Sequence, residues 1–246
     1  MTFSDLVGAG ILMAYYLMVV GLVPTLVRVW TKTPVEVVRK AQHILYSLSI
    51  FVLLNFFSTW YMAVLAAALL VILAYPVLLL VEKSHFYEKY FVDRLPWRGG
   101  ELRKQLIYVQ LSFAVLIFVC WGLLGYSWHY VAAVAVVGWG FGDATAALVG
   151  KAWGRRHVIH RLVERAKTLE GTGAMIVVSA GAMFFTLLFY AGISWYLSLA
   201  ISIIVAPVCG LVELFSRKGT DTLTVPFSAA LLVMSFMYLF SLLGWY

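Results

Sequence analysis

Eight long apolar segments alternate with short polar connections along the chain. A helix that crosses a membrane needs roughly 20 apolar residues, and most of the segments approach or exceed that length. A transmembrane barrel would instead show short strands of alternating polarity. The pattern therefore predicts an all-α, polytopic membrane protein of about eight transmembrane helices. The predicted spans are Leu6–Val29, Gln42–Phe57, Tyr61–Val81, Leu106–Gly125, His129–Gly150, Gly173–Ala191, Trp195–Leu214 and Val225–Gly244.

The composition indicates the same class of protein. Of the 246 residues, 63% are hydrophobic and 12% are charged, and the mean hydropathy is +0.95. A water-soluble domain of this length needs more polar surface to cover its core. Cys120 and Cys209 lie within apolar segments, so we expect buried thiols rather than a disulfide or a metal site. We expect one integral membrane domain over residues 1–246, with the first segment as an anchor rather than a removed leader.

The basic residues predict the orientation of these helices. All 18 lysines and arginines fall into four groups, and the groups occupy alternate connections between the predicted spans. The groups lie within Arg28–Lys40, Lys83–Lys104, Lys151–Lys167 and Arg217–Lys218. The positive-inside rule predicts that these connections are cytoplasmic and that both chain ends lie outside. The net charge of +7 then follows from topology, so we expect membrane lipids as partners and neither nucleic acid nor a protein partner. In a bacterium the location would be the cell membrane.

Two of the basic connections have an amphipathic pattern. The stretch Lys83–Lys104 mixes aromatic and charged residues, which is typical of a segment at the membrane interface. In Gly154–Lys167, apolar residues recur at helical spacing opposite basic ones. This spacing predicts a basic amphipathic helix that binds anionic lipid head groups.

Asp143 is an acid inside an otherwise apolar segment. Such an acid costs about 2.5–3.5 kcal/mol on membrane-insertion scales, so it is a functional candidate. It follows the run Gly138-Trp139-Gly140-Phe141-Gly142. One interpretation is that the glycines unwind the helix and Asp143 caps a half-helix that starts at Ala144. The other is packing, because small residues at Gly138, Gly142, Ala146, Gly150 and Gly154 form a ridge for a neighbouring helix.

A second polar motif, Lys167-Thr168-Leu169-Glu170-Gly171-Thr172-Gly173, opens the sixth predicted helix. A lysine, hydroxyls and glycines before a helix N-terminus suit phosphate, because free backbone N–H groups and the positive end of the helix dipole favour an anion. Helix capping by Thr168 and Glu170 is the simpler alternative.

Further polar residues lie near the ends of three other helices. Glu213 ends the seventh helix, and Asp221 lies in the following turn. Their carboxylates are candidates for a metal or nucleotide site, whereas the alternative is a loop with a cap at Thr224. Arg39-Lys40-x-x-His43 lies at the predicted cytoplasmic mouth of the second helix, where cations beside a histidine suit phosphate.

These motifs, taken together, resemble those of the CTP-dependent lipid kinases, which include dolichol kinase, phytol kinase and the CTP-using diacylglycerol kinase. The similarity spans about residues 39 to 235, in the family's order. It rests on Arg39-Lys40-x-x-His43, Gly142-Asp143-x-x-Ala146-x-x-x-Gly150-x-x-x-Gly154, Lys167-Thr168-x-Glu170-Gly171-Thr172, Glu213 and Thr220-Asp221-x-Leu223-Thr224-x-Pro226. The chain departs from the family at Thr222, where phytol and dolichol kinases usually have asparagine. The longer signature of the related CDP-diacylglycerol synthases is not found here.

The resemblance implies phosphoryl transfer from CTP to a lipid alcohol such as a polyprenol, phytol or a diacylglycerol, with Mg²⁺ as cofactor. It implies that Asp143 holds the metal with help from Glu213 or Asp221, and that Lys167 neutralises the transferred phosphate. Asp143 and Lys167 are thus the expected catalytic residues. The expected nucleotide- or phosphate-binding residues are Arg39, Lys40, His43, Thr168, Gly171, Thr172, Gly173 and Asp221.

Two other functions use the same residues. A phosphatidate cytidylyltransferase would employ the same metal and phosphate site but release pyrophosphate. A transporter with a broken fifth helix would explain Asp143 and its glycines. It would not explain the cytoplasmic position of the motif at Lys167 or the acids after the seventh helix.

Overall fold

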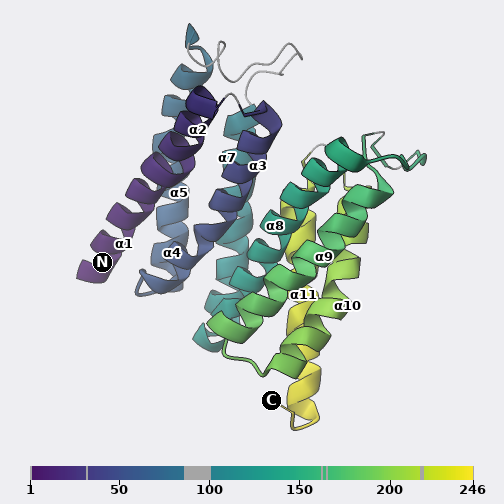
Figure 1. The fold of residues 1–246 in the computed structure, drawn as a ribbon. Coiled ribbons are helices and arrows are strands. Elements are labelled where there is room, and N and C mark those ends of the chain that lie inside the picture. The colour runs from purple at the N-terminus through teal and green to yellow at the C-terminus, as the bar shows by residue number, and fades with distance from the viewer. Residues whose placement is uncertain are drawn as a thin grey trace. The chain divides into compact units, whose positions relative to one another are not determined.

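The computed structural model describes residues 2–31, 33–85, 101–161, 163–164, 166–216 and 219–245. Within these residues, eight helical segments are long and apolar enough to cross a membrane. This confirms the predicted class and number of spans. The segments are Phe3–Thr31, Val35–Asn55, Trp60–Glu82, Arg103–Leu123, Tyr126–Trp153, Leu169–Tyr190, Trp195–Phe215 and Asp221–Leu242. The chain divides into two compact units, Met1–Phe118 and Val119–Tyr246 (Figure 1).

The first unit consists of four spans. The first span is one long helix with a π-helical middle, and the second is broken at Ser49. The elements are α1 (Phe3–Ala14), η1 (Tyr15–Leu22), α2 (Val23–Thr31), α3 (Val35–Leu48), α4 (Ile50–Asn55), α5 (Trp60–Glu82) and α7 (Glu101–Ile117).

Buried polar contacts connect the helices of the first unit. The Asp5 carboxylate accepts hydrogen bonds from the backbone N–H of Ser58 at 2.8 Å and from its hydroxyl at 2.8 Å. The Tyr16 hydroxyl bonds the Ser49 hydroxyl at 2.9 Å and accepts from the Gln110 amide. Interhelical hydrogen bonds of this kind help to hold helices together in lipid, where apolar side chains gain little by leaving the solvent.

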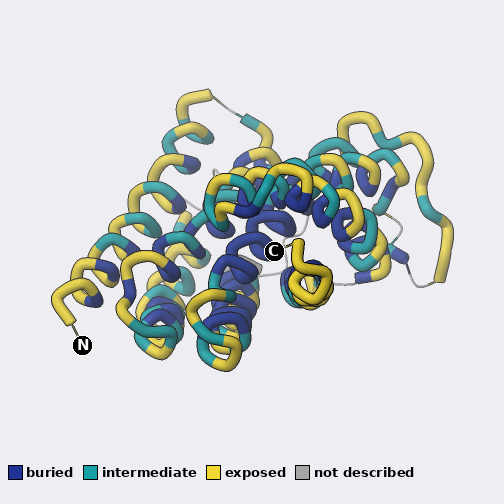
Figure 2. Tube along the Cα trace, turned by 90° about the horizontal axis from the view of Figure 1, so that it is seen from below, coloured by how far each residue is buried: buried dark blue, intermediate teal, exposed yellow. Residues whose placement is uncertain are grey.

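The second unit contains the other four spans. Its elements are η2 (Phe118–Leu123), which begins at the boundary, η3 (Tyr126–Trp128), α8 (His129–Trp153), α9 (Leu169–Phe185), η4 (Thr186–Tyr190), α10 (Trp195–Phe215) and α11 (Asp221–Leu242). Helix α8 has the largest buried share of these spans. In both units, large apolar side chains such as Ile72 and Phe189 remain exposed, and the exposed residues follow the outer sides of the helices (Figure 2). This distribution is expected for surfaces that face lipid.

The glycines before Asp143 pack against a neighbouring helix and do not break α8. The helix is continuous from His129 to Trp153, so the predicted unwinding, with a half-helix starting at Ala144, is wrong. A Cβ atom at Gly142 would collide with the Ser179 hydroxyl, and one at Gly138 would collide with Met183. The glycines therefore allow α9 to approach α8 closely, which confirms the packing interpretation.

The predicted amphipathic helix over Gly154–Lys167 is also wrong for the described residues of that stretch, none of which is helical. The two ends of the stretch pair with each other instead. The N–H of Val158 donates to the Lys167 carbonyl at 3.1 Å, and the N–H of Leu169 donates to the Arg156 carbonyl at 3.0 Å. Backbone pairing thus satisfies groups that a helix would have satisfied internally. Of the predicted interface segment Lys83–Lys104, residues 86–100 lie outside the described residues.

Candidate functional site

The N-terminus of α9 lies directly against the end of α8. The ridge of small residues in α8 makes this contact possible. A Cβ at Gly150 would lie 3.1 Å from the Thr168 hydroxyl, and one at Gly171 would lie 2.7 Å from the Ala146 carbonyl oxygen. Gly154 also contacts Thr168. The structure therefore brings two of the sequence motifs together, namely the glycine ridge and the start of α9.

Thr168 caps the N-terminus of α9. Its hydroxyl accepts a hydrogen bond from the Gly171 N–H at 3.2 Å, and the Thr172 hydroxyl donates to the Thr168 carbonyl at 3.2 Å. Thr168, Gly171 and Thr172 are buried, whereas Gly173 is exposed. The Glu170 carboxylate accepts from the Arg156 N–H at 3.2 Å. Helix capping by Thr168, the simpler of the two interpretations, is thus present in the structure. The Gly171 N–H is already bonded to the Thr168 hydroxyl.

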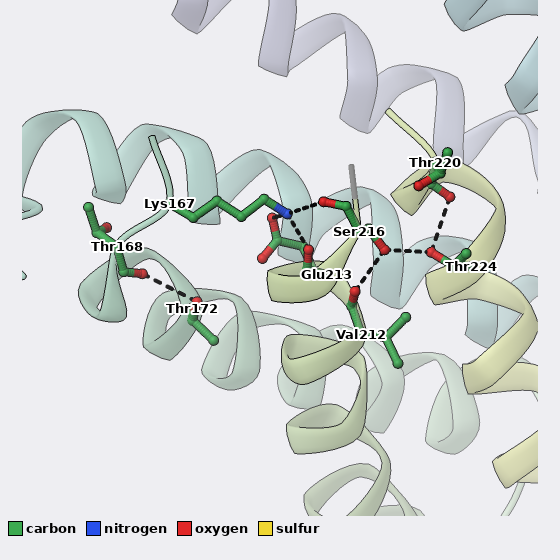
Figure 3. A network of polar contacts seen from close by, with 8 residues as sticks. All are labelled: Lys167, Thr168, Thr172, Val212, Glu213, Ser216, Thr220 and Thr224. Atoms are coloured by element: carbon green, nitrogen blue, oxygen red, sulfur yellow. Dashed lines mark hydrogen bonds and ion pairs between the residues drawn. The ribbon is translucent and has the colours of Figure 1, made fainter. Parts of the chain in front are cut away.

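Lys167 lies next to this N-terminus and reaches the last turn of α10. Its ammonium forms an ion pair with the Glu213 carboxylate, with 2.9 Å between Nζ and Oε1. It also donates to the backbone carbonyl of Glu213 and, at 3.0 Å, to that of Ser216 (Figure 3). The two charged side chains are largely buried, with exposed fractions of 16% and 10%. The structure therefore joins the predicted catalytic lysine to a predicted metal ligand.

Ser216 links the end of α10 to the start of α11. Its hydroxyl donates to the Val212 carbonyl at 2.7 Å and bonds the Thr224 hydroxyl at 2.7 Å. The Thr224 hydroxyl has one hydrogen and donates it either to the Ser216 hydroxyl or to the Thr220 carbonyl, which lies 3.1 Å away. Asp221 is the first residue of α11 and lies in its first turn, where a negative charge is favoured by the helix dipole. Residues 217 and 218 lie outside the described residues.

Asp143 is buried within α8, with 8% of its surface exposed. It lies about three turns, or about 15 Å of helix length, before the helix ends at Trp153. Because the helix is continuous on both sides, Asp143 does not cap a helix. Among the described residues, no group of three His, Cys, Asp or Glu side chains is arranged to hold a metal ion. A site for Mg²⁺ needs only one or two carboxylates, with water and phosphate oxygens as the other ligands.

The remaining predicted site residues belong to the first unit. Arg39 pairs with Glu36 at 2.6 Å on α3, and Lys40 and His43 are buried on the same helix. The His43 ring nitrogen Nδ1 lies 2.9 Å from the Gln105 amide nitrogen of α7. Gln105 was not predicted from the sequence, since its partner lies on a distant helix.

A comparison with curated proteins gives a relative of known name. The phytol kinase of Synechocystis sp. is 33% identical to this chain over 108 residues. Phytol kinase is one of the enzymes that the sequence motifs resemble, so the match supports that resemblance. It covers 44% of this chain and 45% of the relative. The aligned stretch thus spans less than half of the relative's length. No family model matches the chain, and no significant match to a solved structure was found.

Proposed function

We propose that this protein is a kinase that transfers a phosphoryl group from CTP to a lipid alcohol at the membrane surface. The observation that carries the proposal is the position of Lys167, which directly precedes the capped N-terminus of α9 and whose largely buried side chain reaches the end of α10. A cation next to a helix N-terminus is suited to a polyphosphate. The phytol kinase relative supports a lipid substrate and a phosphoryl-transfer reaction.

Phosphoryl transfer requires that the protein neutralise charge and position the reactants, and it does not require covalent catalysis. In the proposal, Lys167 neutralises charge on the transferred phosphoryl group. Thr168, Thr172 and Gly173 contact the phosphates at the start of α9. Arg39, Lys40, His43 and Asp221 are proposed contacts of the nucleotide or its phosphates. A lipid hydroxyl at the interface and a nucleotide from the aqueous phase then meet at the ends of the helices.

We propose Mg²⁺ as the cofactor. Asp143 and Asp221 each supply a carboxylate, which is the ligand type that Mg²⁺ prefers, and Asp143 is a buried acid that an apolar helix does not otherwise need. Glu213 is less suited, because its Oε1 atom already binds Lys167. When bound, Mg²⁺ would offset the negative charge of the triphosphate.

The purified protein, assayed with a panel of lipid alcohols that includes phytol, a polyprenol and a diacylglycerol, tests this function. With Mg²⁺ present, CTP is expected to support transfer to at least one alcohol far better than ATP, with release of CDP. Release of pyrophosphate with phosphatidic acid as substrate would establish a cytidylyltransferase instead. Equal use of ATP and CTP would contradict the proposed choice of nucleotide.

We also propose that the site faces the cytoplasm and that both chain ends lie outside. The proposal rests on the segregation of lysine and arginine into alternate connections. Single cysteines placed beside Arg161 are expected to react with a membrane-impermeant maleimide only after the cells are opened. Cysteines beside Thr59 and Gly192 are expected to react in intact cells. The reverse accessibility at either end would discard this orientation.

A further inference from the structure

The hydrogen bonds of Lys167 account for all its donors. An ammonium group carries three N–H donors and no acceptor. In this structure three acceptors surround Nζ, namely the Glu213 carboxylate at 2.9 Å, the Glu213 carbonyl and the Ser216 carbonyl at 3.0 Å (Figure 3). A phosphate oxygen can therefore bind Lys167 only if one of these acceptors is released.

The three acceptors are not equivalent. The two carbonyls belong to the end of α10, where the last carbonyl groups of a helix have no partner within the helix. A cation is favoured there by the helix dipole. All three bonds are charge-assisted, because the ammonium carries a charge. The carboxylate is the one charged acceptor among the three, so its bond alone adds the attraction between opposite charges. A carbonyl is thus the acceptor that a phosphate oxygen would replace at least cost.

We infer that Glu213 is a positioning residue that holds the Lys167 ammonium at the end of α10, and that it is not a ligand of the metal. This inference rests on the proposed function for its catalytic consequence, but the contact itself is tested without activity. Glu213 keeps the lysine at the end of α10 while the carbonyls act as exchangeable acceptors. We call this group of contacts, made by Lys167, Glu213 and Ser216, the lysine latch.

The lysine latch is tied to α11 as well. Ser216 supplies one carbonyl acceptor, and its hydroxyl bonds Thr224 in the first turns of α11 at 2.7 Å. Ser216 itself is fixed to α10, because its N–H donates to the Glu213 carbonyl at 3.0 Å. The position of the ammonium therefore depends on how the end of α10 packs against the first turns of α11, where Asp221 lies.

Chemical labelling of lysines tests the latch directly. Brief treatment of the full-length protein in detergent with an N-hydroxysuccinimide ester, followed by peptide mass spectrometry, gives the acylation rates of Lys167 and of the exposed Lys151. Lys167 is expected to react at least about tenfold more slowly. Glu213→Gln should raise the Lys167 rate by about tenfold, as the loss of one charge-assisted hydrogen bond allows, and leave the Lys151 rate unchanged.

Two controls keep the labelling result interpretable. Glu170→Gln removes a nearby carboxylate that accepts from the Arg156 N–H rather than from Lys167, and it should leave the Lys167 rate unchanged. Cys209, which is fully buried on α10, should stay unreactive to a maleimide in each variant, which shows that the helices remain packed. Equal rates for Lys167 and Lys151 in the parent protein, or no effect of Glu213→Gln, would overturn the latch.

The kinase assay then separates positioning from metal binding. For Glu213→Gln we expect kcat to fall about tenfold, with the Mg²⁺ concentration for half-maximal activity unchanged. Loss of a metal ligand would instead raise that concentration by tenfold or more, and this outcome would overturn the assignment. A protein with slow Lys167 labelling but no CTP-dependent activity would contradict the proposed function and leave the latch intact.

Discussion

Asp143→Asn is expected to give a folded protein whose CTP-dependent turnover is lower by at least about two orders of magnitude. Asparagine keeps the size of the side chain and removes its negative charge, which the proposed Mg²⁺ site requires. Losses of this size are common when one electrostatic group of an active site is removed. The measurement is turnover at matched amounts of folded protein and at saturating Mg²⁺.

The stability of the same variant separates a catalytic role from a structural one. An ionised aspartate at the centre of a membrane helix costs about 2.5–3.5 kcal/mol, and a neutral amide costs less. The midpoint of thermal unfolding in detergent is therefore measured beside turnover, and a midpoint close to that of the parent, with turnover greatly reduced, shows that Asp143→Asn lost chemistry rather than fold. Turnover close to that of the parent protein would show that the carboxylate does not hold the metal, and the packing role of the glycine ridge would be all that remains.

The membrane spans could be predicted because their signal is local. The length and apolar composition of each segment are enough to predict a membrane span. Helix α5, for example, was predicted as Tyr61–Val81 and is found at Trp60–Glu82. The ends shifted by a residue or more, since a helix continues until its caps or its partners stop it. Burial within a unit is not a local property, and it therefore needed the structure.

Two local conformations in the second unit could not be read from the sequence. The glycines of α8 left both unwinding and packing open, and the helix is continuous and packs closely against Ser179 and Met183. The stretch after α8 has helical spacing, but pairing of Val158 with Lys167 competes successfully for its backbone groups. A contact from another helix decided the first conformation, and a pairing between the two ends of the stretch decided the second. The spacing of apolar residues along a segment reports neither of these contacts.

The sequence predicted which residues belong to the candidate site but not which of their side chains contact one another. Lys167 and Glu213 lie 46 positions apart, and the sequence pattern favours Glu213 as a metal ligand rather than as the partner of a lysine. The sequence also did not predict that Gly150 and Gly154 contact Thr168, although it predicted the ridge of small residues to which both glycines belong. Only the packing of α8, α9 and α10 determines which acid meets the lysine.

Lys167→Met is expected to reduce turnover by about a hundredfold or more, in line with the loss of other electrostatic stabilisers of transferred charge. Methionine keeps much of the apolar length of the side chain but removes the ammonium. The end of α10 then loses its cation, so we also expect a modest fall in thermal stability, of about 0.5–2 kcal/mol for a partly buried charge at a helix terminus.

Arg161→Ala is the matched control, because Arg161 is an exposed cation of the same connection between α8 and α9. It should retain turnover within about threefold of the parent, as expected for a screened surface charge. Turnover is compared at matched folded amounts, so that the expected loss of stability in Lys167→Met does not count as loss of chemistry. If Lys167→Met and Arg161→Ala have the same turnover, Lys167 serves only as a cation at the end of α10, and its proposed role in neutralising the phosphate is wrong.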